Sequence, residues 1–220
     1  MIAGDFIQSE IPMLHLSDHV STALNFFDDY KLNQIPVLGP EGFLGLIDEE
    51  VVLNAPLNYH LKDLKKHLSK QRITDEQNLF DALSFFRNGK LCILPVVDKN
   101  NKYLGCIHER DLLQKVCEWL KVAEPGGILH IEVSMRDYSL AQIAQIVEGN
   151  GAKILNSLCL PHSSNTKMIE VLIKINQEEL SGIIQTFERY EYKIIASFHK
   201  NIYKKGLDDR FDSFIRYLNI

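Results

Sequence analysis

Residues 35–53 read IPVLGPEGFLGLIDEEVVL, and residues 94–113 read LPVVDKNNKYLGCIHERDLL. Both stretches have an apolar residue before a proline, a short apolar run, a polar turn, an aromatic-Leu-Gly sequence and a charged segment. Pro36 and Pro95 lie 59 positions apart, and the second turn contains one more residue than the first. A pattern that occurs twice at a fixed offset indicates an internal repeat, and this repeat decides the fold.

The repeat also covers the segment before each proline, where apolar residues recur at helical spacing. The pairs that share the offset of 59 are Ala23 and Ala82, Leu24 and Leu83, Phe27 and Phe86, and Leu32 and Leu91. Each repeat is therefore predicted to run helix, strand, turn, strand, helix. Because one such unit is too small for a good core, the two should pack on each other.

The repeated residues match the pattern of a known family, in which an apolar residue, Pro-Val-Val-Asp and a turn precede Gly-apolar-apolar-Thr-x-x-Asp. The matching residues are Pro36, Gly45, Pro95, Gly105 and Asp111. Over about residues 1–120 the chain resembles a tandem pair of cystathionine-beta-synthase (CBS) domains. This resemblance implies the CBS fold, with the segment before the first helix paired to the opposite repeat.

Composition is ordinary for a soluble globular protein: 220 residues, 45% hydrophobic and 24% charged. No apolar run approaches the roughly twenty residues of a transmembrane helix. The start, MIAGDFIQSE, lacks the basic residues and apolar core of a signal peptide. The net charge of −5 argues against nucleic acid as the main partner. We therefore expect a cytoplasmic protein with neither a membrane nor a nucleic acid as its partner.

Motifs of catalysis and metal binding are missing from the sequence. It has no Gly-x-Ser-x-Gly, no phosphate loop and no His-Glu-x-x-His, and its eight histidines do not cluster at ligand spacings. The four scattered cysteines are interpreted as reduced core thiols; they are Cys92, Cys106, Cys117 and Cys159. We expect a protein that is not an enzyme, with no catalytic residue and no metal site.

Cap and breaker residues set the expected ends of elements. Ser17-Asp18 and Thr74-Asp75 are expected to cap the first helix of each repeat. Leucines at helical spacing predict a connector helix over residues 57–68. Pro-Gly-Gly at residues 125–127 marks a domain boundary. We expect a CBS pair over 1–122 (repeats about 1–56 and 57–122), a second domain over 127–199 and a tail over 200–220.

The second domain is predicted to run strand, helix, strand, strand, helix, strand. Residues 128–135 alternate as a strand, a helical stripe stops at Gly149-Asn150-Gly151, and Asn176 is expected to cap the second helix. Such a split βαβ plan gives a four-stranded antiparallel, ferredoxin-like sheet with both helices on one face. The fold class is therefore α/β (α+β), a CBS pair followed by a βαββαβ domain.

The order of these elements, with Gly-Ala-Lys-Ile at the start of the second strand, resembles the ACT domain, a regulatory fold that often binds amino acids. At the glycine of that family's ligand loop this chain has Tyr138, which removes the close approach to the backbone that glycine permits. A CBS pair followed by an ACT domain resembles the bacterial acetoin-utilisation-type regulatory proteins. The tail has one apolar helical face, for docking on its own chain, on a dimer mate or on a partner; its residues are Leu207, Phe211, Phe214, Ile215 and Leu218.

The resemblance implies an adenine nucleotide in the CBS cleft, with the motif Asp on the ribose and the motif Thr on ribose or phosphate. Asp111 matches the Asp, and His108 replaces the Thr. In the first repeat Asp48 replaces the Thr and Val51 replaces the Asp, so a ribose acceptor is lost there and a charge that repels phosphate is gained. The predicted site is the second-repeat cleft, bounded by Arg72, Ile93, Leu94, Pro95, His108 and Asp111.

Two interpretations of function remain open at this point. The first is a regulatory sensor whose ligand is AMP, ATP or S-adenosylmethionine, with a homodimeric assembly and a regulated protein partner. The second is a structural oligomerisation module, in which Asp111 is only an early-helix carboxylate in a degenerate scaffold.

Overall fold

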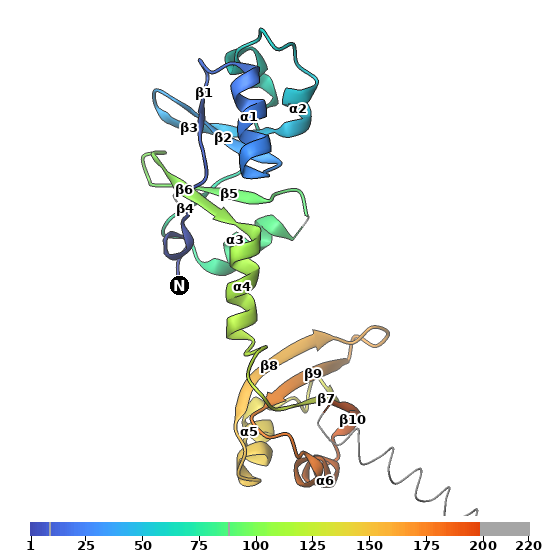
Figure 1. The fold of residues 1–220 in the computed structure, drawn as a ribbon. Helices are drawn as coiled ribbons and strands as arrows, with labels where there is room; N and C mark the ends of the chain where they lie inside the picture. Colours follow the sequence, from blue (N-terminus) through green and yellow to red (C-terminus); the bar gives the residue numbers. More distant parts are fainter. Residues whose placement is uncertain (9, 88, 199–220) are drawn as a thin grey trace, which may run out of the picture. The chain divides into compact units, whose positions relative to one another are not determined.

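The computed structural model describes residues 1–8, 10–87 and 89–198 and divides into two compact units, Met1–Val116 and a second beginning at Cys117 (Figure 1). The division falls inside a helix, a few residues before the boundary predicted at 123–127, and the domain limits drawn from the sequence stay predictions. The predicted amphipathic tail over 200–220 lies outside the described residues.

Two sheets of the same design make up the first unit. In the first repeat the elements are β1 (Leu14–His15), α1 (Val20–Tyr30), β2 (Gln34–Gly39), β3 (Gly42–Asp48) and α2 (Glu49–Leu53). In the second they are β4 (Ile73–Thr74), α3 (Leu79–Phe86), β5 (Ile93–Val97), β6 (Tyr103–His108) and α4 (Glu109–Trp119). Sheet orders β1-β2-β3 and β4-β5-β6 match, which confirms the predicted order of helix, strand, strand and helix.

The repeated apolar residues form the core of this unit. Three of the four repeated pairs are buried, namely Ala23, Phe27, Leu32, Ala82, Phe86 and Leu91, while Leu24 and Leu83 are partly exposed. Strand β5 is buried along its whole length, and Cys106 on β6 is buried beside it. Burial of this thiol raises its pKa to about 12, so it behaves as a small apolar residue.

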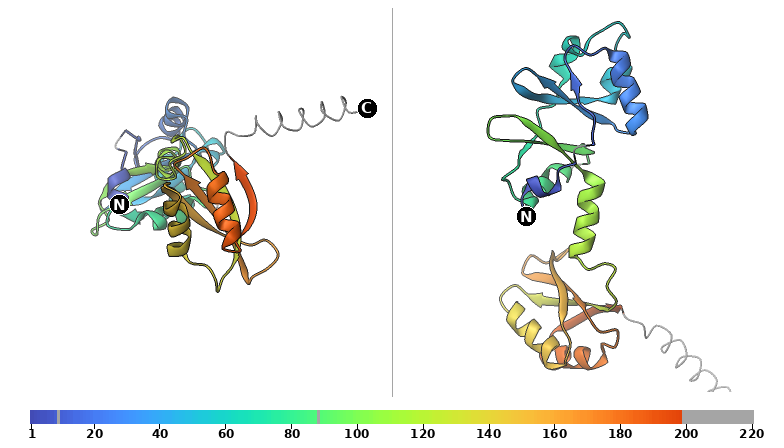
Figure 2. Two further views of the ribbon diagram at one scale, coloured as in Figure 1. Left: turned by 90° about the horizontal axis from the view of Figure 1, so that it is seen from below. Right: turned by 60° about the vertical axis from the view of Figure 1, so that its left-hand side comes forward.

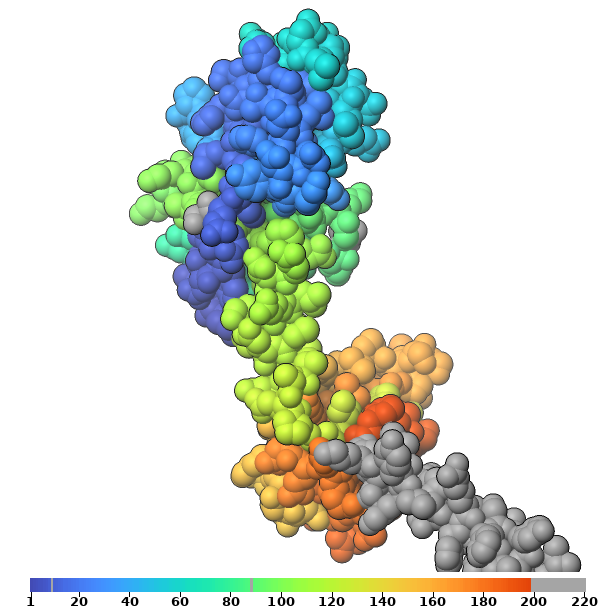
Figure 3. Space-filling model, in the orientation of Figure 1, coloured from blue at the N-terminus to red at the C-terminus, as the bar shows by residue number. Residues whose placement is uncertain are grey.

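Each repeat also pairs with an extended segment that precedes the other repeat in the sequence. Residue Gln8 forms an antiparallel bridge with Cys106 on β6, and Ser69 forms the equivalent bridge with Leu46 on β3. Figure 3 shows the N-terminal residues, in dark blue, lying against the green second repeat. The pairing that the CBS resemblance implied for the N-terminal segment is therefore present.

The repeated glycines permit this close crossing. A Cβ on Gly45 would lie 2.7 Å from both Leu68 Cβ and Ser69 O. A Cβ on Gly105 would lie 2.9 Å from Gln8 O, and the φ of Gly105 is +145°, which side chains rarely adopt. The two glycines of the sequence repeat are thus explained by the backbone that passes over them.

The second unit has the predicted strand and helix order. Its elements are β7 (Gly127–Ser134), α5 (Leu140–Gly149), β8 (Ile154–Pro161), β9 (Met168–Ile175), α6 (Ser181–Arg189) and β10 (Lys193–Phe198). The sheet order is β10-β7-β9-β8 with every pair antiparallel, and Figure 2 shows both helices on one side of it. Residues facing the helices, such as Leu129, Ile131 and Ile173, are fully buried with Phe187. This is a ferredoxin-like split βαβ sheet.

Helix ends are where the sequence predictions are wrong. The residue before α1 is His19, and Asp18 instead accepts a hydrogen bond from the His15 backbone. Thr74 lies in β4, and Asn78 caps α3 by accepting from the Asp81 backbone. In the second unit, Leu180 precedes α6. The predicted cap there, Asn176, accepts from the Lys153 backbone instead.

The connector predicted as a helix over 57–68 is a shorter 3-10 helix, η2 (Leu61–His67). Leu61 and Leu64 are buried as expected, but Leu57 is 65% exposed because it lies before the helix, directly after Pro56. Of the four cysteines, Cys159 is exposed on β8 and is not a core thiol. Within the described ranges, no helix is both long and apolar enough to span a bilayer.

Candidate functional site

The two motif residues of the second repeat, His108 and Asp111, lie on the same hollow of about 190 Å³ in the first unit. His108 ends β6, and Asp111 is in the first turn of α4. The full lining is Gln8, Glu10, Ile11, Tyr30, Leu32, His108, Arg110 and Asp111. The hollow therefore has one wall from each repeat and one from the N-terminal segment.

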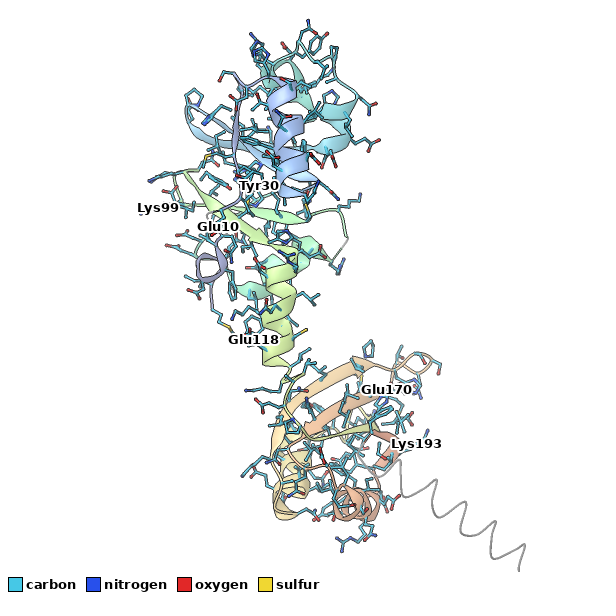
Figure 4. All side chains as sticks on the ribbon, viewed as in Figure 1. Glu10, Tyr30, Lys99, Glu118, Glu170 and Lys193 are labelled. Carbon is cyan, nitrogen blue, oxygen red and sulfur yellow. The ribbon has the colours of Figure 1, made fainter. Side chains whose placement is uncertain are left out.

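The pairing of the N-terminal segment with the second repeat explains which residues line this hollow. Gln8 forms an antiparallel bridge with Cys106, two residues before His108 at the end of β6, and Gln8 and His108 line the same hollow. The end of α1 contributes Tyr30 from the other repeat, and Figure 4 shows Glu10 and Tyr30 close to each other where the two repeats meet. Residues from both ends of the CBS-like region thus converge on one site.

The side chains around the hollow offer groups of different chemistry. Asp111 is half-buried and supplies a carboxylate acceptor, while Arg110 is exposed and supplies guanidinium donors. Tyr30 is 50% exposed, so its ring is accessible from solvent. Glu10 adds a second carboxylate. The Nδ1 atom of His108 accepts a hydrogen bond from the Arg110 backbone N–H at 3.1 Å.

Of the six residues predicted as one site, His108 and Asp111 line this hollow. Ile93, Leu94 and Pro95 are buried in the core on β5 and do not line it. Arg72 directly precedes β4, on the linker that pairs with the first repeat at Ser69, and its guanidinium group donates to the Lys70 carbonyl at 3.5 Å. Arg72 does not line this hollow either, and the grouping of the six residues stays a prediction. Whether His108 and Asp111 bind a nucleotide stays a prediction.

Sequence reasoning missed the rest of the lining: Gln8, Glu10, Ile11, Tyr30, Leu32 and Arg110. One signal was available, because the expected pairing of the N-terminal segment with the opposite repeat brings Gln8 to β6. No sequence signal marks Tyr30, which matches Gly89 in the second repeat.

A second hollow, of about 440 Å³, lies between the repeats at the motif positions of the first. It is lined by Asn33, Gln34, Asp48, Glu49, Glu50, Gly89, Lys90, Leu91, Cys92 and Glu109. Four of these side chains are acidic and one is basic, so the local field opposes a phosphate. The loss of a nucleotide site in the first repeat, expected from Asp48 and Val51, is consistent with this charge.

Gln34 links the two repeats inside the acidic hollow. Its Nε2 atom donates to Asp48 Oδ1 at 2.7 Å and to the Lys90 carbonyl at 3.1 Å. Its Oε1 atom accepts from the Cys92 backbone N–H at 3.2 Å. Gln34 is only 7% exposed, so these three bonds satisfy a buried amide. The Asp48 carboxylate consequently has a structural partner.

In the ranges 1–8, 10–87 and 89–198, no group of three or more His, Cys, Asp or Glu side chains is placed to hold a metal ion. All four cysteines are free thiols.

The CBS domain family model matches residues 3–58 and 71–118, one match for each repeat. Residues 3–118 contain a tandem CBS pair. The CBS motif ends of the two repeats are the segments that carry Asp48 and Asp111, so both hollows lie at CBS motif positions. Tandem CBS pairs are typical of regulatory, nucleotide-binding modules.

Several solved structures are similar to this chain over about half of its length. A CBS domain pair/ACT domain protein from Thermotoga maritima is 24% identical over 54% of this chain and 98% of that chain, with a TM-score of 0.49. The protein CBSX2, solved in complex with AMP, is 22% identical over 53% of this chain and 96% of that chain (TM-score 0.44). A protein from Vibrio cholerae described as an acetoin utilization protein is 16% identical over 56% and 96% (TM-score 0.48). The assignment of the CBS pair rests on the family model and the repeat.

Proposed function

We propose that this protein is a non-catalytic regulatory sensor that binds an adenine-containing nucleotide in the hollow lined by His108 and Asp111. One observation supports this above the rest: the motif carboxylate of Asp111 lines a solvent-open hollow together with an aromatic ring from the other repeat, Tyr30, and a guanidinium group, Arg110. These three groups match the three parts of a nucleotide.

Each part of the ligand has a chemical partner in this proposal. The Asp111 carboxylate accepts hydrogen bonds from the two vicinal ribose hydroxyls. The adenine ring packs on Tyr30 and Leu32. The phosphate lies at the rim, where Arg110 and the amino-terminal end of the eleven-residue helix α4 favour negative charge. The hollow of about 190 Å³ is smaller than a typical pocket for a ligand of this size, so the phosphate stays in contact with solvent.

A structural role is the second candidate, and Glu10 is the observation that favours it. This carboxylate lines the same hollow as Asp111, and two carboxylates oppose the entry of a phosphate. In that case the CBS pair serves as a scaffold for association and takes no small molecule.

A thermal-shift screen of the full chain with AMP, ATP and S-adenosylmethionine separates the two candidates. A ligand at one hundred times its dissociation constant stabilises the protein by about 2.7 kcal/mol, which is a shift of several degrees. If the protein is a sensor, its melting temperature rises with at least one of the three ligands. Inorganic triphosphate, which lacks the adenosine group, is the control for charge alone. An unchanged melting temperature with all three ligands at millimolar concentration would contradict the sensor and support the scaffold.

We further propose that the second unit is an ACT-like domain through which a cytoplasmic homodimer communicates with a regulated protein partner. The support is the βαββαβ order and the sheet order β10-β7-β9-β8, whose outer strands leave open edges in the described chain. Closed two-fold symmetry is the common solution for such surfaces. Light scattering at micromolar concentration should give twice the chain mass of 25.2 kDa. A mass of one chain would contradict the dimer.

A further inference from the structure

A third hollow, of about 200 Å³, lies in the second unit on the sheet face opposite α5 and α6. Its lining is mostly apolar and consists of Leu120, Val122, Ile128, Asn156, Leu158, Leu172 and Lys174. The strand residues share one face because Lys174 pairs in register with Ile128 and Asn156, while the alternate residue Ile173 points into the core. This hollow is therefore separate from the core and from the CBS clefts.

One cation lies at this hollow, and it is buried. The side chain of Lys174 is 9% exposed on β9. Its ammonium group donates to the carbonyl oxygens of Lys121 and, at 3.2 Å, Val122, and Asn156 beside it donates to the Leu120 carbonyl. Two of the three N–H groups of the Lys174 ammonium thus donate hydrogen bonds to these carbonyls, and the third has no such acceptor among them.

The charge of Lys174 has no anionic partner here. None of the lining residues is acidic, and no ion pair of Lys174 is present in the described part of the chain. A buried ammonium group with neutral acceptors alone carries a large desolvation cost, which a bound anion would offset. The surrounding leucine and isoleucine side chains favour an anion with an apolar body.

We propose that this hollow is a binding site for a short apolar monocarboxylate, whose carboxylate accepts from Lys174 Nζ while its hydrocarbon chain packs on Ile128, Leu158 and Leu172. A volume of about 200 Å³ suits a chain of about four to six carbons. An amino acid is disfavoured, because its α-ammonium group would lie near Lys174 with no acidic side chain in the lining to pair it. This site is independent of the proposed nucleotide site.

Titration calorimetry of the full chain with 4-methylvalerate tests the site. The neutral isostere 4-methylvaleramide and the zwitterion leucine are the ligand controls. Saturable binding is expected for the acid, with both controls at least about tenfold weaker because each loses or opposes the contact with the ammonium group. Equal affinity for acid and amide, or no saturable binding of the acid at millimolar concentration, would show that Lys174 serves only to cap the carbonyls that follow α4.

Two variants on the same sheet face locate the ligand. Leu172→Phe adds volume inside the hollow and keeps the Lys174 side chain, and it should weaken binding of 4-methylvalerate at least about tenfold. Leu160→Phe adds the same volume on β8, outside the lining, and should change affinity less than about twofold. Equal effects of the two variants, or competition by AMP, would place the acid elsewhere and overturn the proposal. Asp111→Ala should leave this binding unchanged.

Discussion

Replacing Gln34 with leucine should destabilise the first unit by about 2–4 kcal/mol. The substitution removes the bond to the Asp48 carboxylate and two bonds to backbone groups of Lys90 and Cys92. A hydrogen bond to a charged group contributes about 1.5–3 kcal/mol and a neutral one about 0.5–1.5 kcal/mol, and the apolar gain of leucine offsets part of the loss. The volume of a leucine side chain is compatible with this strand position, because the second repeat has Ile93 at the equivalent place.

The assay is the urea dependence of hydrogen exchange on peptides from β2 and β5, which keeps the second unit out of the measurement. Gln114→Leu, an exposed glutamine on α4, is the matched control and should stay within about 0.5 kcal/mol of the parent. If Gln34→Leu has the same free energy of unfolding as this control, the bonds between the repeats do not hold the CBS pair together and the reasoning fails.

Two further predictions concern the crossing segment and the second sheet. Gly105→Val should destabilise the first unit by about 2–4 kcal/mol, because its Cβ meets Ile7 and the backbone φ is +145°. Gly149→Ala, whose Cβ meets nothing within 4 Å at the end of α5, is the control and should not destabilise the protein. Glu132→Gln should destabilise the second unit at neutral pH, because a hydrogen bond from Lys193 lowers the pKa of Glu132 below its ordinary value of 4.5. That stabilisation is present above 4.5 and is lost as the pH falls through the lowered pKa, so urea midpoints of parent and variant should converge on acidification. A difference that persists unchanged in acid would contradict the role of this ion pair.

The strands of both units were predictable because their signals are local. A proline before an apolar run and a glycine after a turn occur at the same positions in each repeat, and Pro36 and Pro95 both lie within buried strands. In the second unit, the alternation along residues 128–135 matches β7, where buried and partly exposed residues alternate. Breakers such as Gly149-Asn150-Gly151 ended their helices where expected.

The starts of α1 and α6 and most of the lining of the site were not predictable, since they depend on contacts distant in sequence. His19 and Leu180 precede helices without a capping hydrogen bond, so no cap residue marks them. The repeat suggests that each cleft is built within one repeat, yet the bridge between Gln8 and Cys106 brings the N-terminal segment to the second motif. The exchange of segments therefore decides which residues meet Asp111.

The most direct test of the nucleotide site is titration calorimetry of AMP into the parent protein, Asp111→Ala and Asp48→Ala. A hydrogen bond to a charged group contributes about 1.5–3 kcal/mol, so Asp111→Ala should weaken binding by about ten- to a hundredfold. Asp48→Ala should leave the affinity unchanged or raise it, because the hollow it lines is acidic. Unchanged affinity in Asp111→Ala, or loss of binding in Asp48→Ala, would place the ligand in the other cleft and contradict the proposed site.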